Sequence, residues 1–74
     1  MVGRNFWAVE ERGGWEVRQE GLPDGTTRHS SRDEAWQAAQ ARARAEHGDA
    51  FLADGQGGYS EHTCFRELPR KAKD

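Results

Sequence analysis

The sequence predicts a small α+β domain, in which an antiparallel sheet of order β-β-β-α-β-β carries one helix packed across one face. Alternating apolar and polar residues on both sides of one alanine-rich stretch indicate strands that flank a helix. Glycine-rich turns of a few residues separate the strands, and such short connections favour antiparallel neighbours. Because 74 residues suffice for one domain at most, we expect a single domain over residues 1–68 and a disordered basic tail over residues 69–74.

Three strands are predicted before the helix. Residues 5–10 are rich in aromatic and β-branched side chains, which fit a pleated surface. The glycines at 13–14 suit a hairpin turn, and residues 15–20 then alternate between apolar and charged side chains. Residues 21–25 contain Pro-Asp-Gly and read as a turn. A short polar strand at residues 26–30 is expected to pair back onto residues 15–20.

The alanine-rich stretch has clear helix start and stop signals. Ser31 or Ser30 can cap its N-terminus, and Glu34 completes a capping box with Ser31. The helix is expected to run to His47, with Gly48 as the left-handed residue that ends it. The stripe at three- and four-residue spacing consists of Ala35, Trp36, Ala39, Arg42, Ala43 and Glu46.

Two strands are predicted after the helix. Residues 49–54 hold a short apolar run, residues 55–58 form a hairpin loop, and residues 59–67 alternate again. Pro69 ends regular structure. We expect the core to contain Trp15, Val17, Trp36, Ala39, Ala43, Phe51 and Ala53.

These fold motifs resemble a known family over about residues 14–66. The pattern consists of Gly14-Trp15-x-Val17, Glu20-Gly21, His29-Ser30, Glu34-Ala35-Trp36-x-x-Ala39-x-x-x-Ala43, Gly48 and Asp54-Gly55-x-Gly57. It is similar to the prokaryotic domain of unknown function 2188 family. The resemblance implies a small α+β domain with a helix on a sheet, and it implies no activity. The strand at residues 5–10 lies outside this pattern, and Trp36 and Arg42 replace the smaller or apolar residues usual in the family.

Charge and composition exclude several classes of protein. The formal net charge is −2, so no strong overall field favours a partner of either sign. The longest apolar runs are far shorter than the ~20 residues of a transmembrane helix, and the N-terminus shows no secretory signal. Cys64 is the only cysteine, so no intramolecular disulfide can form. We therefore expect a cytoplasmic protein with no membrane partner.

The sequence offers little chemistry. His62 and Cys64 share one face of a predicted strand, but only His29 and Asp54 could join them as remote metal ligands. The same pair as nucleophile and base would need a pocket that so short a chain has little room to build. We expect no catalytic residue, no metal site and no cofactor, and therefore no enzyme.

Binding is the expected function, through protein–protein contacts or self-association. Trp7 and Val9 share one face of the first strand and Phe6 and Ala8 the other, so either orientation leaves aromatic surface exposed. The expected partner is an unknown protein or a second copy. The candidate binding surface consists of Phe6, Tyr59, Phe65, Arg66, Arg70 and Lys71.

Nucleic-acid binding is the alternative, with sheet aromatics that stack on bases and a basic C-terminal tail. It is not favoured, because residues 45–65 hold four carboxylates and no Lys or Arg.

Overall fold

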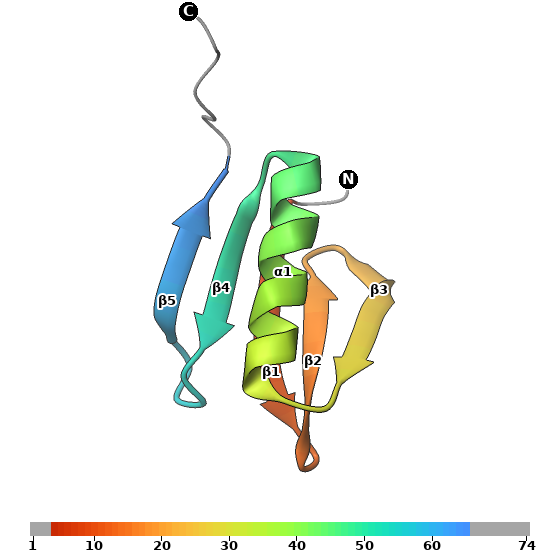
Figure 1. Ribbon diagram of the computed structural model, residues 1–74, viewed down its shortest axis with the longest axis vertical. Coiled ribbons are helices and arrows are strands. Elements are labelled where there is room, and N and C mark those ends of the chain that lie inside the picture. The colour runs from red at the N-terminus through yellow and green to blue at the C-terminus, as the bar shows by residue number, and fades with distance from the viewer. Residues whose placement is uncertain (1–3, 66–74) are drawn as a thin grey trace, which may run out of the picture.

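The computed structural model of the protein describes residues 4–65. These residues form one helix and a five-stranded sheet of order β3-β2-β1-β4-β5 (Figure 1). The elements are β1 (Asn5–Glu11), β2 (Gly14–Gln19), β3 (Leu22–His29), α1 (Arg32–Glu46), β4 (Asp49–Ala53) and β5 (Tyr59–Cys64). The predicted α+β class and the order of elements are confirmed.

The sheet is mixed, although we expected it to be wholly antiparallel. β1 and β4 are central neighbours and run parallel, while the other neighbouring pairs are antiparallel (Figure 1). The reason is the direction of α1. The helix follows β3 and runs back along the sheet, so β4 starts at the end where β1 starts. A helical crossover of this kind produces parallel strands, whereas a short hairpin produces antiparallel ones.

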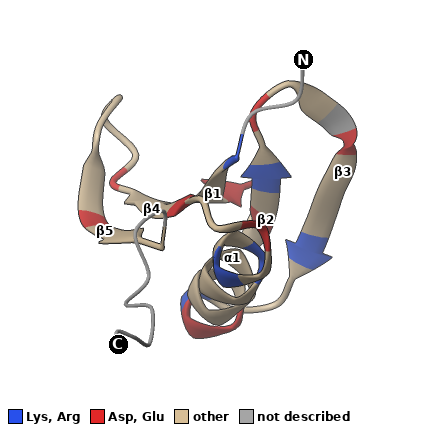
Figure 2. Cartoon of the chain, turned by 90° about the horizontal axis from the view of Figure 1, so that it is seen from above, with Lys and Arg blue, Asp and Glu red and all other residues tan. Residues whose placement is uncertain are grey.

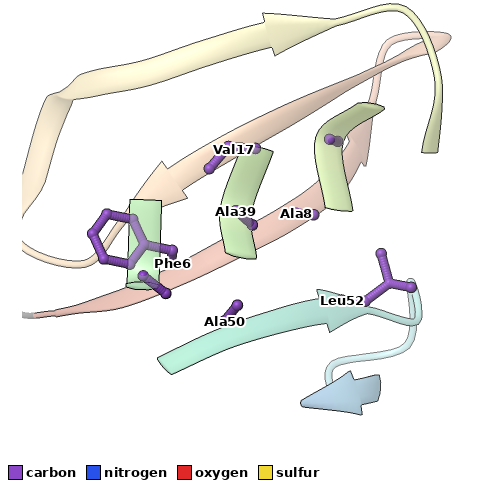
Figure 3. Close-up of a cluster of buried hydrophobic side chains, with 8 residues drawn as sticks. Phe6, Ala8, Val17, Ala39, Ala50 and Leu52 are labelled. Atoms are coloured by element: carbon purple, nitrogen blue, oxygen red, sulfur yellow. The ribbon is translucent and has the colours of Figure 1, made fainter. Parts of the chain in front are cut away.

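The core lies between α1 and one face of the sheet (Figure 3). Its buried side chains are Phe6, Ala8, Val17, Ala35, Ala39, Ala43, Ala50 and Leu52. The alanines of α1 let the helix backbone approach the sheet closely, because their side chains end at Cβ. The guanidinium of Arg42 lies 5.1 Å from the ring centroid of Phe6 and covers the edge of this core.

Burial confirms part of the predicted core and corrects the rest. The confirmed members are Val17, Ala39 and Ala43. Trp15 and Trp36 pack against the core but are only partly buried. Ala53 is half-buried at the end of β4. Phe51 was wrongly placed, because Ala50 and Leu52 point toward α1 and strand alternation sends Phe51 to the opposite face.

The helix begins and ends near the predicted residues, but two predicted roles fall on neighbouring residues. The Ser31 hydroxyl accepts a hydrogen bond from the Glu34 N–H at 3.1 Å, whereas the Glu34 carboxylate accepts from the Ser30 N–H at 3.1 Å, one residue before the predicted Ser31 partner. At the other end His47, not Gly48, takes the left-handed conformation with φ 56°. Gly48 is required for a different reason: a Cβ at this position would overlap the carbonyl oxygen of Arg4.

The first turn lies where it was predicted, but the predicted turn at residues 21–25 is wrong: the chain turns at residues 20–21, and Pro23-Asp24-Gly25 belongs to β3. Arg12 and Gly13 make the first turn with φ of 55° and 77°. β3 already starts at Leu22, because Leu22 pairs with Gln19 and a register shift in β2 takes up the irregularity. The last strand ends at Cys64, before its predicted end at residue 67, and Phe65 no longer belongs to it. Residues 66–67, the domain boundary at residue 68 and the tail at 69–74 lie outside the described residues.

Candidate functional site: the open face of the sheet

α1 covers one face of the sheet and leaves the other uncovered by any described element (Figure 2). We call the uncovered side the open face. The alternation of β1 separates Trp7 and Val9 from Phe6 and Ala8, as the sequence predicted, and the structure puts Trp7 and Val9 on the open face, a choice that the sequence left undecided. Cross-strand pairing adds residues of the other strands, so that the open face includes Asn5, Trp7, Val9, Glu11, Glu16, Arg18, Asp49, Phe51, Tyr59, His62 and Cys64.

Three rings form a stack across β1, β4 and β5. Trp7 and Phe51 have centroids 4.4 Å apart with planes 13° from parallel, and Phe51 and His62 are 4.5 Å apart at 9°. These residues are direct cross-strand partners. Tyr59 meets the rings of Trp7, Phe51 and His62 edge-on, with centroid distances of 6.3, 5.1 and 5.8 Å. We call Trp7, Phe51, Tyr59 and His62 the aromatic cluster.

The stacked rings stand on edge on the sheet. Their centroid distances are close to the ~4.8 Å spacing of neighbouring strands. Nearly parallel rings at that spacing lie face to face from one strand to the next, so each ring plane is roughly perpendicular to the direction that joins neighbouring strands. Both faces of the Phe51 ring are therefore covered by neighbours. The cluster presents mainly ring edges to the surroundings.

Polar contacts fix the two ends of the stack. The Trp7 indole N–H donates to Glu20 Oε2 at 2.9 Å, and Asn5 Nδ2 donates to Glu20 Oε1 at 3.0 Å. At the other end His62 Nε2 lies 2.6 Å from Oδ2 of Asp49, whose side chain is largely buried. The aromatic cluster is thus held in one arrangement before any partner arrives.

The strands on the other side of β1 carry charges on the same face. Arg18 Nη2 lies 3.1 Å from Glu11 Oε1 and 3.0 Å from Glu16 Oε1. Arg28 Nη1 lies 2.7 Å from Glu16 Oε2. The hydrogen bond from Arg18 is the main cause that lowers the pKa of Glu16 below its usual range; burial opposes it, and the hydrogen bond from Arg28 and the charges of both arginines lower the pKa further. The open face therefore has an aromatic half on β1, β4 and β5 and a charged half on β2 and β3.

The residues of the predicted binding surface do not gather in one place. Tyr59 is 50% exposed and belongs to the aromatic cluster. Phe6 is 1% exposed, so its placement on a surface was wrong: it faces α1 and is in the core. Phe65 packs partly buried against the core. The basic residues lie outside the described residues: Arg66, Arg70 and Lys71.

Three residues of the aromatic cluster were missing from the predicted surface: Trp7, Phe51 and His62. Their position depends on the parallel register of β1 and β4, which brings Trp7 opposite Phe51. The sequence contained one signal for the aromatic cluster: the period of two around Trp7 had already placed that ring on the face opposite Phe6.

The residues considered for metal binding have structural roles in the described chain. His29 Nε2 pairs with Thr27 Oγ1 at 2.9 Å. Asp54 Oδ1 accepts the N–H groups of Gln56 at 2.7 Å and Gly58 at 3.2 Å, which closes the loop before β5. Within residues 4–65 no three His, Cys, Asp or Glu side chains gather as metal ligands would. The helix in that range, α1, is not long and apolar enough to span a membrane.

Comparison with known proteins gives a family and no characterised relative. No curated protein and no solved structure matches the chain significantly. One bacterial family model matches residues 6–59, from β1 to the first residue of β5. This range includes β1, which we had expected to lie outside the family pattern. The chain therefore belongs to DUF2188, a family described as uncharacterized proteins conserved in bacteria.

Proposed function

We propose that this protein is a small, non-enzymatic interaction module that binds protein surfaces through the aromatic half of its open face. One observation carries this function: an ordered aromatic cluster lies on a sheet face that no described element covers. Exposed aromatic patches with a polar rim are typical of protein interfaces. Tyr59 is the most exposed member of the cluster and the natural anchor for a partner.

The fixed geometry of the cluster favours binding. Edge contacts hold Tyr59 against Phe51 and His62 before a partner arrives. Ordering these side chains therefore costs little on association. The ion pairs of Glu11, Glu16 and Arg18 border the aromatic half and supply a polar rim.

The ring geometry gives little support to base stacking, the basis of the nucleic-acid alternative. A base needs an accessible ring face, and both faces of Phe51, in the middle of the stack, are covered by neighbouring rings. The described arginines on this face, Arg18 and Arg28, are already paired with Glu11 and Glu16, so they offer little net positive charge to phosphates.

A non-enzymatic role in the cytoplasm is part of the same hypothesis. Its support is the exposed, unpaired thiol of Cys64, which suits a reducing compartment. The described residues offer His62 only as a partner of Asp49, so no second base stands ready beside the thiol.

Capture from a native bacterial lysate tests this function. Tagged wild type is compared with Tyr59→Ala, and Gln56→Ala in the adjoining exposed loop serves as the matched control. We expect wild type and Gln56→Ala to retain the same protein, and Tyr59→Ala to lose it by about tenfold, the effect of losing one interface anchor. Equal capture by Tyr59→Ala, or retention of nucleic acid alone that falls steeply with salt, would overturn the hypothesis.

A further inference from the structure

We infer that the partner is a second copy of this chain, which adds its β5 antiparallel to β5 of the first copy across a two-fold axis at His62. The two sheets would become one, and the stack of rings would continue from one copy into the other. This inference rests on the proposed function, because it names the partner of the aromatic half.

The two edges of the sheet differ in how well they are protected. On the β3 edge, Pro23 lacks a backbone N–H, whereas β5 contains no Pro, Lys or Arg. Each edge strand has one register shift against its neighbour, and the one charged residue of β5 is Glu61. α1 packs over β1, β2 and β4, so β5 lies beyond the helix (Figure 2). Within residues 4–65, β5 is therefore the edge with fewer barriers to another strand.

The backbone of β5 directs hydrogen-bonding groups outward at His62. The Phe65 N–H donates to the Gly48 carbonyl at 2.8 Å and so points toward the start of β4. Because N–H groups alternate in direction along a strand, those of His62 and Cys64 point to the free edge. Pairing centred on His62 lets this residue exchange both hydrogen bonds with its own symmetry copy.

Neighbouring registers are less favourable. In an antiparallel pair, the side chains of directly opposite residues point to the same face of the sheet. At a two-fold axis a residue must therefore lie opposite its own copy, and the axis cannot pass between two successive residues. An axis at Glu61 would place two carboxylates opposite each other, which is destabilising. An axis at Thr63 would set His62 against Cys64 and break the row of rings. An axis at His62 instead sets Glu61 against Thr63 of the second copy.

The ring stack ends where the second copy would continue it. Tyr59 contacts all three rings, with the longest centroid distance being 6.3 Å to Trp7. It must therefore lie alongside the stack, and it does not cover the outer face of His62. Rings within the stack repeat at 4.4 and 4.5 Å. The opposite His62 would follow at about the strand spacing of ~4.8 Å.

The charges on the helix side of β5 are also complementary between copies. A groove of about 620 Å³ separates α1 from β5, and its lining includes Gln40, Arg44, Thr63 and Phe65. Arg44 is the only charged lining residue, and no residue in 4–65 makes an ion pair with it. Pairing about His62 brings Glu61 of one copy to Thr63 of the other, and therefore to this groove. Glu61 Oε2 lies 3.9 Å from Arg32 Nη2 of its own copy, so each copy would share this exposed carboxylate between its own Arg32 and Arg44 of the second copy.

Sedimentation equilibrium under reducing conditions tests the dimer. Cys64→Pro removes an outward N–H but no hydrogen bond to β4, while Cys64→Ala is the matched control with its N–H intact. We expect wild type and Cys64→Ala to be dimeric at ~200 µM and to dissociate at micromolar concentration, since a pair of short strands buries little area. Cys64→Pro should be monomeric with an unchanged helical circular dichroism spectrum. A monomeric wild type at ~1 mM, or a Cys64→Pro dimer as stable as that of Cys64→Ala, would overturn the inference.

Cysteine cross-linking tests the register. In His62→Cys/Cys64→Ser the two introduced thiols face each other at the axis, with a Cα separation of ~5.5 Å that suits a disulfide. In the control Thr63→Cys/Cys64→Ser each thiol faces a glutamate. Mild oxidation should cross-link the first variant and leave the second monomeric on a non-reducing gel. Cross-linking of the second variant, or of neither, would overturn the axis at His62.

The two hypotheses fail separately. A monomeric wild type that still captures another protein through Tyr59 would overturn the dimer and support the proposed function. A dimer that Cys64→Pro disrupts, together with no capture that depends on Tyr59, would support the dimer and overturn the proposed function.

Discussion

His47 and Gly48 show how two adjacent residues satisfy different constraints at one chain reversal. His47 takes the left-handed conformation and its N–H donates to the Arg44 carbonyl at 3.3 Å. The Gly48 N–H donates to the Ala43 carbonyl at 2.8 Å, which closes the last turn of α1. Gly48 also lies against the Arg4 backbone, just before β1. The absence of a side chain at Gly48 thus lets the helix end meet the central strand.

Gly48→Ala should destabilise the protein strongly. Its Cβ would overlap the carbonyl oxygen of Arg4, and backbone on both sides must shift to relieve the contact. We expect a loss of ~3 kcal/mol in the free energy of unfolding, the upper range for overpacking. Urea denaturation followed by circular dichroism measures the loss. His47→Gly is the control, since glycine accepts the left-handed conformation without strain, and it should match or exceed wild type by up to ~1 kcal/mol. A Gly48→Ala variant as stable as wild type would contradict the assignment.

At the scale of elements, the start of α1 is defined by its own sequence. Glu34 Oε1 accepts hydrogen bonds from the Ser30 N–H at 3.1 Å and the Ser30 hydroxyl at 3.0 Å. The backbone bond and then the hydroxyl bond lower the pKa of Glu34 below its usual range, against a smaller effect of desolvation. The carboxylate therefore closes the helix start only while it is ionised.

Acidification should weaken this cap. Because the pKa of Glu34 is lower in the folded than in the unfolded state, its contribution is complete above the unfolded pKa and is lost as pH falls. We expect the stability of wild type to fall more steeply than that of Glu34→Gln between about pH 5 and pH 3. Glu34→Gln should be the less stable protein at pH 7. Urea midpoints measured across this range provide the comparison, and parallel curves for the two proteins would rule out a role for the charge.

Local signals predicted the elements, and non-local pairing decided their faces. Glu34 three residues after Ser31 was enough to start the helix, and Gly13 to mark the first turn. Alternation identified Val17 as buried. The run at residues 50–53 is apolar throughout, so it carries no period of two, and Phe51 was assigned to the wrong face. Trp7, Phe51 and His62 meet only because β4 lies parallel to β1, which a short range of sequence does not specify.

At the scale of the whole molecule, the open edge follows from the width of the helix. A helix ~10 Å across covers two to three strands spaced ~4.8 Å apart. α1 lies over β1, β2 and β4, so a sheet that also contains β3 and β5 extends beyond it on both sides (Figure 1). Three features lie together on the β5 side: an edge strand without Pro, Lys or Arg, the end of the ring stack, and a groove in which Arg44 is the only charged lining residue. Association through β5 would complete all three features at once.

Charge reversal provides the test of this arrangement that leaves backbone and rings intact. Glu61→Lys would face Arg44 of the second copy and replace two attractions across the axis with two repulsions, and it would also face Arg32 of its own copy, which Glu61 approaches to 3.9 Å. We expect the dimer dissociation constant to rise about tenfold at ~50 mM salt, with a smaller effect at high salt. Arg44→Glu alone should weaken the dimer similarly, and Arg44→Glu/Glu61→Lys should restore it to within about threefold of wild type, because the double variant rebuilds the pair with its signs exchanged. Sedimentation equilibrium measures all four proteins. A double variant no tighter than the weaker single variant would show that these residues do not meet across the axis.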